Sequence, residues 1–487
     1  MLSSLNVKIG LEIHTQLTSL KTKLFCSCSA DYRKKPPNSL TCPVCLGLPG
    51  SLPVLNRKAV ELAVMVALAL NCKVSEKMLF FRKNYYYPDM PKNFQISQYD
   101  RAGGVPIAVD GYLDIRMDRE RRRIRITRVH LEEDPGKLVH LGAIDTSPYT
   151  LVDYNRAGVA LLEIVTEPDL RSPREARRFL QKLRSILEHL GVFDGGLEGA
   201  LRCDANVSIE GGTRVEVKNI SSFKAVERAL TFAIIRQKNL LSRKERVRRE
   251  TRHWDENRRV TISLRTKEEE QDYRYFPEPD LTTVVLEPGF IEKINKEMPE
   301  LPDARIERFI REYTLPRYDA EVLVGEKAIA DFYEECVRLY EKPKEVSNWI
   351  MGDVLRYLYE NDLEIQKSKL TPELLVEMLR LIDDGTISGK IAKELLPEMI
   401  TKGESPSRLV KVRGLRRIAS REVIEELAEK VFLENPKAVE DALVDPKAVH
   451  YLIGQIMKAT RGTADPQLTN EIVTAKLEKI KREHNSE

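Results

Sequence analysis

The stretch that decides the fold is Val7–Gln16, which reads VKIGLEIHTQ. Apolar and polar side chains alternate, and because a β-strand has a side-chain period of two, we predict a strand with one face toward a core. The polar face carries Glu12 and His14. A carboxylate and an imidazole placed side by side on a strand can hold a divalent metal or transfer protons. The alternative is a polar face that is simply solvated, as on many antiparallel sheets.

The composition sets the broad class of the protein. A chain of 487 residues with 42% hydrophobic content is long enough for about three domains with packed cores. No uninterrupted apolar run approaches the ~20 residues of a membrane helix, and no cationic N-terminal segment precedes an apolar run, so we expect a cytoplasmic protein. The net charge of +4 neither demands nor excludes a nucleic acid. The 32% charged residues fit an ion-pair-rich surface, as in heat-adapted proteins.

Four of the seven cysteines lie close together in the sequence, Cys26 and Cys28 followed by Cys42 and Cys45. In a cytosolic protein this spacing favours a metal site over disulfides. The second pair lies in a knuckle-like turn that can direct two thiolates at one tetrahedral Zn²⁺, although the first pair is more tightly spaced than usual. We predict a structural zinc site, because four thiolates leave no position for a substrate; free thiols are the alternative.

Four further strands are predicted at residues 121–129, 161–165, 201–209 and 215–220. The first is basic and leads into three consecutive carboxylates, which offer oxygen ligands for Mg²⁺ or form an acidic solvated turn. The last two repeat the pattern of residues 7–16, with polar faces that carry Arg202, Asp204, Asn206, Ser208, Glu216 and Lys218. Carboxylates for a metal and cations for phosphate are what phosphoryl transfer requires. No Walker-type loop is present, so a nucleotide is expected to lie on the sheet.

Two segments interleave basic residues with aromatic residues and prolines, namely 81–98, which contains Lys83, and 271–280, which contains Arg274. Such segments are suited to contact a nucleotide or a nucleic acid. Loops that pack on their own domain are the alternative.

Helical signals account for most of the remaining chain. Asn56 and Ser172-Pro173 are expected to begin helices that run to about Asn71 and His189. A long basic helix and its exit are predicted from about residue 224 to 259, and helices alone after about residue 292. Gly, Ser and Pro indicate a linker at about residues 402–407, before a basic helical tail that can neutralise RNA phosphates or be merely solvated. The fold class is therefore α+β.

Taken together, segments along most of the chain resemble those of a known family, the B subunits of the bacterial tRNA-dependent amidotransferases. The resemblance follows the chain in order from Val7 to about Asp280, and the tail from about Arg408 resembles the YqeY-like domain of that family. It rests on these segments: Ile9–His14, Arg82–Asp89, Gln95–Gln98, His130–Asp134, Leu161–Val165, Leu201–Asn206 and Asp272–Asp280.

The resemblance implies a fold and an activity. Residues 1–292 would form a cradle-like mixed or antiparallel sheet domain, similar to glutamine synthetase, with the zinc loop at about 26–45. Residues 293–405 would form a helical domain and 406–487 a YqeY-like tail, and these two all-α domains would hold the tRNA. The protein would use ATP and Mg²⁺ to phosphorylate the side-chain carboxylate of Glu on tRNA(Gln), or of Asp on tRNA(Asn). Ammonia from a glutaminase A subunit would then form the amide, and a small C subunit would hold the pair together.

The resemblance also implies roles for individual residues. The magnesium ligands would be Glu12, His14 and Glu133, with Glu216 as a further candidate. Four cations would stabilise phosphate or carboxylate: Lys83, Arg202, Lys218 and Arg274. Asp204 and Asn206 would contact the metal shell or the substrate.

Two hypotheses from other classes remain open. A non-catalytic tRNA-binding scaffold would account for the tail and the zinc loop, but it assigns no purpose to the carboxylates on the polar faces. A ligase acting on small molecules would leave the basic tail unexplained.

Overall fold

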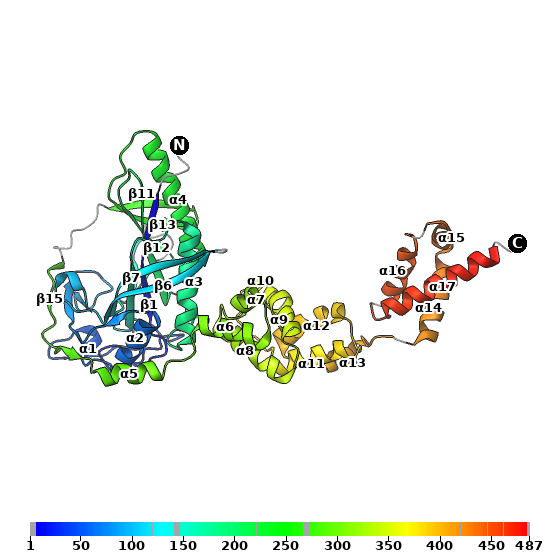
Figure 1. The fold of residues 1–487 in the computed structure, drawn as a ribbon. Coiled ribbons are helices and arrows are strands. Elements are labelled where there is room, and N and C mark those ends of the chain that lie inside the picture. Colours follow the sequence, from blue (N-terminus) through cyan, green and yellow to red (C-terminus); the bar gives the residue numbers. More distant parts are fainter. Residues whose placement is uncertain are drawn as a thin grey trace. The chain divides into compact units, whose positions relative to one another are not determined.

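The computed structural model describes residues 6–117, 120–140, 147–195, 197, 199–220, 222–265, 273–418, 420–445, 447–460 and 462–484. The chain forms two compact units, Met1–Arg305 and Ile306–Glu487 (Figure 1). In the described ranges, we find no helix with the length and apolar character needed to cross a membrane.

The first unit is built on one mixed sheet whose strands follow the order β14-β13-β12-β11-β1-β10-β7-β6-β2. Their bounds are β1 (Val7–Gln16), β2 (Lys73–Val74), β6 (Ala108–Met117), β7 (Glu120–Glu133), β10 (Ala160–Thr166), β11 (Leu201–Ile209), β12 (Val215–Ile220), β13 (Thr251–Asp255) and β14 (Val260–Arg265). The paired strands are antiparallel except for β12 and β13. The predicted strand at residues 7–16 is confirmed, and it lies at the centre of the sheet.

Smaller sheets and helices complete the first unit. The short strands are β3 (Lys77–Met78), β4 (Phe81–Asn84), β5 (Phe94–Ser97), β8 (Lys137–His140), β9 (Thr150–Asp153), β15 (Phe276–Pro277) and β16 (Val284–Val285). The helices are α1 (Pro43–Leu46), α2 (Arg57–Ala69), η2 (Asp100–Ala102), α3 (Pro173–His189), α4 (Phe223–Ser242) and α5 (Pro288–Lys296). As expected, Asn56 and Ser172 cap α2 and α3, each accepting a hydrogen bond from a backbone N–H in the first turn.

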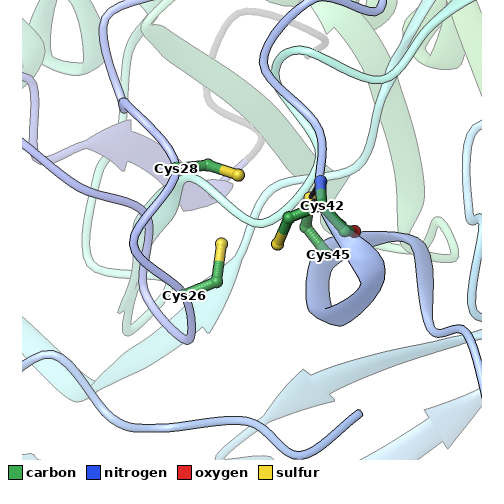
Figure 2. Close-up of side chains that lie close together, drawn as sticks. All are labelled: Cys26, Cys28, Cys42 and Cys45. Atoms are coloured by element: carbon green, nitrogen blue, oxygen red, sulfur yellow. Dashed lines mark hydrogen bonds between the residues drawn. The ribbon is translucent and has the colours of Figure 1, made fainter.

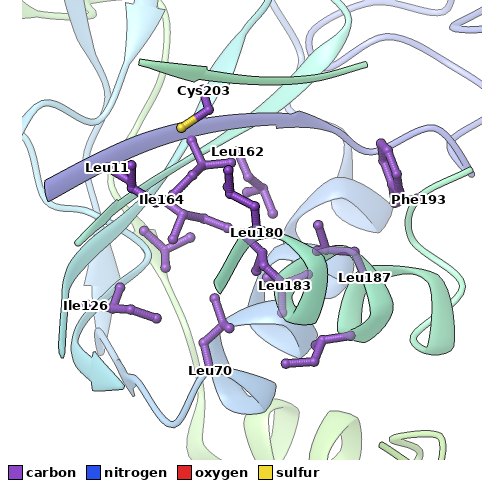
Figure 3. Packing of buried hydrophobic residues seen from close by; sticks show 14 of the residues in the cluster. Leu11, Leu70, Ile126, Leu162, Ile164, Leu180, Leu183, Leu187, Phe193 and Cys203 are labelled. Carbon is purple, nitrogen blue, oxygen red and sulfur yellow. The ribbon is translucent and has the colours of Figure 1, made fainter. Parts of the chain in front are cut away.

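One face of the large sheet packs against helices α2, α3 and α4. Their apolar side chains meet those of the strands in one core. Figure 3 shows part of it, with Leu180 and Leu183 of α3 close to Leu162 and Ile164 of β10. Ile9, Leu11 and Ile13 of β1 are buried in this core. Each contributes about 1.5–3 kcal/mol relative to an exposed side chain. Because side chains alternate along a strand, this burial directs the polar residues of β1 to the opposite face of the sheet.

The prediction for residues 224–259 is partly wrong. Helix α4 ends at Ser242, Lys244 takes a left-handed backbone conformation at φ +60°, and residues 251–255 form strand β13. A left-handed residue ends a right-handed helix. Strand β13 pairs in parallel with β12, and Trp254 packs in the core. The basic composition of the segment suggested a helix, but pairing at the sheet and burial of Trp254 decide the strand.

In the described residues from Pro302 on, the regular elements are helices, as predicted: α6 (Pro302–Tyr313), α7 (Arg317–Leu323), α8 (Lys327–Leu339), α9 (Pro343–Trp349), η4 (Ile350–Val354), α10 (Leu355–Glu360), η5 (Ile365–Lys367), α11 (Pro372–Asp383), α12 (Gly389–Lys402), α13 (Pro406–Arg413), α14 (Arg421–Glu434), α15 (Pro436–Val444), α16 (Val449–Ala459) and α17 (Pro466–His484). One isolated β-bridge joins Ile418 and Ala464. One core extends from Phe309 to Leu415 and includes residues of α13, so it continues past the predicted linker. A second core joins α14 to α17.

Candidate active site

The polar face of the sheet gathers residues from several strands. His14 on β1 lies opposite Glu163 on β10, and Glu163 lies opposite His130 on β7. On the other side of β1, Glu12 lies opposite Asp204 and His14 opposite Arg202. Residues directly opposite each other in a ladder project from the same face. The ladder register therefore builds one polar surface out of strands that are far apart in the sequence.

Glu12, His14 and Glu163 form a group that can hold a metal ion, with one ligand atom from each within 4.8 Å of the others. The His14 Nε2 atom lies 3.6 Å from a Glu163 oxygen, 3.8 Å from a Glu12 oxygen and 4.0 Å from a Glu132 oxygen. Carboxylate oxygens are the ligands that Mg²⁺ prefers, and imidazole suits several other divalent ions.

The groups of this cluster perturb one another's ionisation. Burial, together with the charge of Glu163, raises the pKa of Glu132 to about 7 and raises the pKa of Glu12. Burial alone would lower the pKa of His14, but the hydrogen bond to Glu163 and the surrounding carboxylates raise it to about 9. Burial works against ionisation of Glu163 as well, but His14 and its other cationic neighbours hold the pKa of Glu163 below its usual range. Such perturbed groups are typical of functional sites.

Glu133 is not part of this group, although sequence analysis chose it as a metal ligand. Side chains alternate along β7, so Glu132 shares the polar face with His130 and Glu133 projects from the opposite face. Both oxygens of Glu133 accept hydrogen bonds from Lys92 Nζ at 2.5 Å, and one also accepts from the Ile96 N–H. Both of its oxygens are therefore engaged by Lys92 in this structure.

Glu163 takes the place expected for Glu133. Sequence analysis predicted only a buried strand at residues 161–165 and assigned Glu163 no role. The available signal was a single carboxylate inside an otherwise apolar strand. A charged residue is almost never buried without a partner, so this residue could have been chosen for the site.

A second group of charges lies on β11 and β12. Lys218 Nζ lies 2.8 Å from Asp204 Oδ2 and 3.3 Å from Glu216 Oε1. Burial would lower the pKa of Lys218, but these carboxylates raise it above its ordinary value. The buried Oδ1 of Asn206 has no hydrogen-bond partner in the structure. A buried polar atom without a partner is rare and is free to accept a bond from a ligand.

A cavity of about 1190 Å³ lies over the polar face. It is lined by five residues from the sequence-based set: Glu12, Lys83, Asn206, Glu216 and Lys218. Further cations and aromatic residues that sequence analysis did not select also line it: Lys8, Tyr99, Arg101, Arg128, Arg214, Arg249, Tyr273 and Tyr275. The carboxylates and the cations together suit a ligand with several phosphates and a metal ion.

The two aromatic segments meet at this cavity. Tyr99 and Tyr275 are stacked, with ring centroids 5.0 Å apart, and Lys83 Nζ lies 5.0 Å from the Tyr273 ring. Arg274 lies beside the Tyr86 ring, 6.0 Å from its centroid, and does not line the cavity formed by the described residues. Of the two cations expected to stabilise phosphate or carboxylate in these segments, Lys83 but not Arg274 thus lines the cavity formed by the described residues.

The four cysteines predicted to bind zinc come together in space (Figure 2). One sulfur from each lies within 4.8 Å of the others, and none forms a disulfide. The Cys45 sulfur accepts the N–H of Cys42 at 3.1 Å, and the hydrogen bond from Cys26 is the main cause that lowers the pKa of Cys45 to about 4. Four converging sulfurs fit a tetrahedral site for a soft metal such as Zn²⁺. The other three cysteines, Cys72, Cys203 and Cys336, are buried.

Hydrogen bonds connect the cysteine loop to the polar face. The Tyr32 hydroxyl, within this loop, donates to Gln16 Oε1 at 3.0 Å, and Gln16 Nε2 donates to Asp134 at 2.6 Å. Asp134 accepts from the Arg202 guanidinium at 2.5 Å, and this ion pair raises the pKa of Arg202. The loop thus supports the position of Arg202.

Comparisons with known proteins agree on one family. Residues 7–292 match the family model described as the GatB/GatE catalytic domain, and residues 331–477 match the GatB domain. The chain is 54% identical to the B subunit of the aspartyl/glutamyl-tRNA(Asn/Gln) amidotransferase from Saccharolobus solfataricus, over 97% of this chain and 99% of that protein. It is 53% identical to the protein of the same name from Thermotoga maritima, over 96% of this chain and 98% of that protein. It is 51% identical to the protein of the same name from Carboxydothermus hydrogenoformans, over 97% of this chain and 98% of that protein.

Proposed function

We propose the following activity because the chain belongs to the family of amidotransferase B subunits. The protein activates the side-chain carboxylate of Glu on tRNA(Gln), or of Asp on tRNA(Asn), by ATP-dependent phosphorylation, and then amidates it with ammonia. The names of these relatives include both tRNAs, which supports both substrates. The single observation that carries the phosphorylation step is the cluster Glu12–His14–Glu163 on the polar face of the sheet.

The cluster is proposed to bind Mg²⁺, which when bound would bridge to phosphate oxygens and offset their charge. Glu132 lies close enough to complete the set, since its carboxylate is 4.0 Å from His14. Glu216 lines the same cavity and can approach a second ion or a nucleotide-bound metal. Glu133 is not included, because Lys92 occupies both of its oxygens.

The cations of the cavity are proposed to bind the anions of the reaction. Lys218 and Lys83 line the cavity, and Arg214 and Arg249 add two more positive charges to its wall. Arg202 projects from the same sheet face, where Asp134 fixes its guanidinium. These groups would position the triphosphate and the carboxylate and stabilise the charge that develops as the acyl phosphate forms. Asp204 orients Lys218, and Asn206 offers its unpaired oxygen to the substrate.

Amide formation makes few demands on this chain. Ammonia is itself the nucleophile, and the substrate carboxylate is ionised at neutral pH, so no side-chain base is required. We propose that a glutaminase A subunit supplies the ammonia and that a small C subunit completes the complex. The helical part and the YqeY-like tail would hold the tRNA, and the cytoplasm is the expected location.

The cysteine cluster is proposed to bind one structural Zn²⁺ through Cys26, Cys28, Cys42 and Cys45. The convergence of four sulfurs supports this proposal. The bound ion would fix the loop that carries Tyr32 and thereby the chain of hydrogen bonds to Arg202.

The proposal is tested in the complete complex with its A and C partners, Glu-tRNA(Gln), Mg²⁺, γ-labelled ATP and ammonium as nitrogen donor. Glu12→Gln and Glu163→Gln are expected to lose ADP formation and Gln-tRNA formation together, while tRNA binding and the partner's glutaminase activity persist. Glu210→Gln, at an exposed position after β11, is the matched control. If both cluster variants turn over like the unaltered chain, the tRNA-binding scaffold is the better explanation.

A further inference from the structure

Lys23 is buried without any exposed surface, although it carries an ammonium group. It lies between β1 and Cys26, and its Nζ donates to the carbonyl of Leu40 at 2.8 Å and to that of Tyr154 at 3.4 Å. Its third partner is the Cys45 sulfur, at 3.7 Å. The ammonium group thus points into the cysteine loop.

No carboxylate in the described part of the chain forms an ion pair with Lys23 within 4.0 Å. Glu133 approaches the same part of the fold, since a Cβ added to Gly158 would lie 3.6 Å from Lys23 Cδ and 3.9 Å from Glu133 Oε2. Glu133 is, however, paired with Lys92. The two carbonyl partners satisfy N–H donors but carry no net charge. Burying an unpaired charge carries a large free-energy penalty, which an anion beside Lys23 would offset.

The cysteine cluster is the anion that the structure offers. Four thiolates around one divalent cation leave a net charge of minus two, which is itself unfavourable away from water. The Cys45 sulfur contacts both the Cys42 N–H and Lys23 Nζ, so two donors face the cluster. The charges of the buried ammonium and of the metal–thiolate centre are opposite, and among the described residues no salt bridge pairs Lys23 with a carboxylate.

We propose that Lys23 is the resident counter-cation of a metal–thiolate centre formed by Cys26, Cys28, Cys42 and Cys45. This inference rests on the proposed zinc site. Lys23 acts through its positive charge on the affinity of the cysteine site for the metal, and it takes no part in the catalysed reaction. Partners that contact the ligands of a metal commonly change its affinity by about 10- to 100-fold. Removal of the positive charge is therefore expected to weaken zinc binding by about this factor.

The test compares the metal affinities of full-length variants by competition with a chromogenic chelator. Lys23→Met removes the charge while keeping the length of the side chain, and Lys23→Gln removes the charge but keeps hydrogen-bond donors. Both are expected to bind Zn²⁺ about 10- to 100-fold more weakly than the unaltered chain. Lys21→Met, which changes an exposed lysine of the same segment, is the matched control and is expected to keep full affinity.

Co²⁺ substitution separates a charge effect from a loss of structure. The variants are expected to keep the intense sulfur-to-cobalt absorption and the tetrahedral spectrum of a four-thiolate site, because the cysteines are unchanged. An unchanged zinc affinity in Lys23→Met would overturn the proposal, as would wild-type affinity in Lys23→Gln, which would indicate hydrogen bonding instead of charge. Loss of the four-thiolate spectrum would also overturn it, since Lys23 would then be a packing residue. If the unaltered chain itself binds neither Zn²⁺ nor Co²⁺, the zinc proposal fails instead.

Discussion

The substitution Glu163→Gln tests which carboxylate belongs to the metal site: Glu163, which the structure brings to His14, or Glu133, which was expected from the sequence. Glu163 is the carboxylate closest to His14 Nε2 among the three that contact it, at 3.6 Å. A divalent ion and a carboxylate about 4 Å apart interact by about 8 kcal/mol at an effective dielectric constant of about 20. The amide oxygen and water will offset part of this loss, so we expect metal binding to weaken by about 3 kcal/mol, which corresponds to a factor of about 100.

The assay is titration of the full chain with Mn²⁺ as a spectroscopically visible substitute for Mg²⁺, followed by electron paramagnetic resonance in the presence of ATP. Glu133→Gln is measured in parallel, with thermal stability recorded for both variants, because Lys92 would lose its partner. We expect Glu133→Gln to affect stability more than metal affinity. If Glu133→Gln weakens Mn²⁺ binding as strongly as Glu163→Gln does, the assignment of Glu163 in place of Glu133 is refuted.

Three further outcomes are expected. Leu11→Ala empties a position in the central strand that is 1% exposed, so the free energy of unfolding should fall by about 2–5 kcal/mol in a denaturant titration; a loss well below this range would contradict the packing described. Lys218→Met leaves Asp204 and Glu216 without their shared cation, so a fluorescent ATP analogue should bind at least about tenfold more weakly, and unchanged affinity would exclude Lys218 from phosphate binding. Removal of the proposed Zn²⁺ by a chelator should raise hydrogen exchange in residues 26–45 while exchange in the core of β1 is unchanged; equal exchange before and after chelation would argue against a structural metal.

Local patterns predicted the parts of the fold in which burial is strongly periodic. The alternation in residues 7–16 predicted β1 because a one-residue shift would bury Glu12 and His14 and expose the apolar residues. The strands β11 and β12 and the caps of α2 and α3 followed from equally local signals. Residues 251–255 could not be predicted in this way, because their strand forms by pairing with β12, a contact between distant segments.

In the candidate site, too, local patterns predicted some residues, whereas contacts between distant segments decided others. Sequence alone placed Glu12 and His14 on one face, and the cysteine spacing predicted the cluster that the structure contains. Three consecutive carboxylates, Glu132 to Asp134, could not be told apart, because alternation along a strand assigns neighbours to opposite faces without stating which face is which. The buried lysine beside Cys45 was also not foreseen, since its partners come from three separate segments.

The sequence by itself determined the central strand, the strands β11 and β12, the starts of α2 and α3, the polar face of each of these strands, the family, and part of the set of residues able to bind metals. Only the tertiary structure decided which carboxylates meet. The register between β1, β10 and β7 brings Glu163, rather than Glu133, to His14, and it leaves Glu133 to Lys92. The physical reason is that side-chain periodicity is a property of one strand, whereas a binding site depends on the alignment of several strands, which is set by hydrogen bonding and packing between segments far apart in the chain.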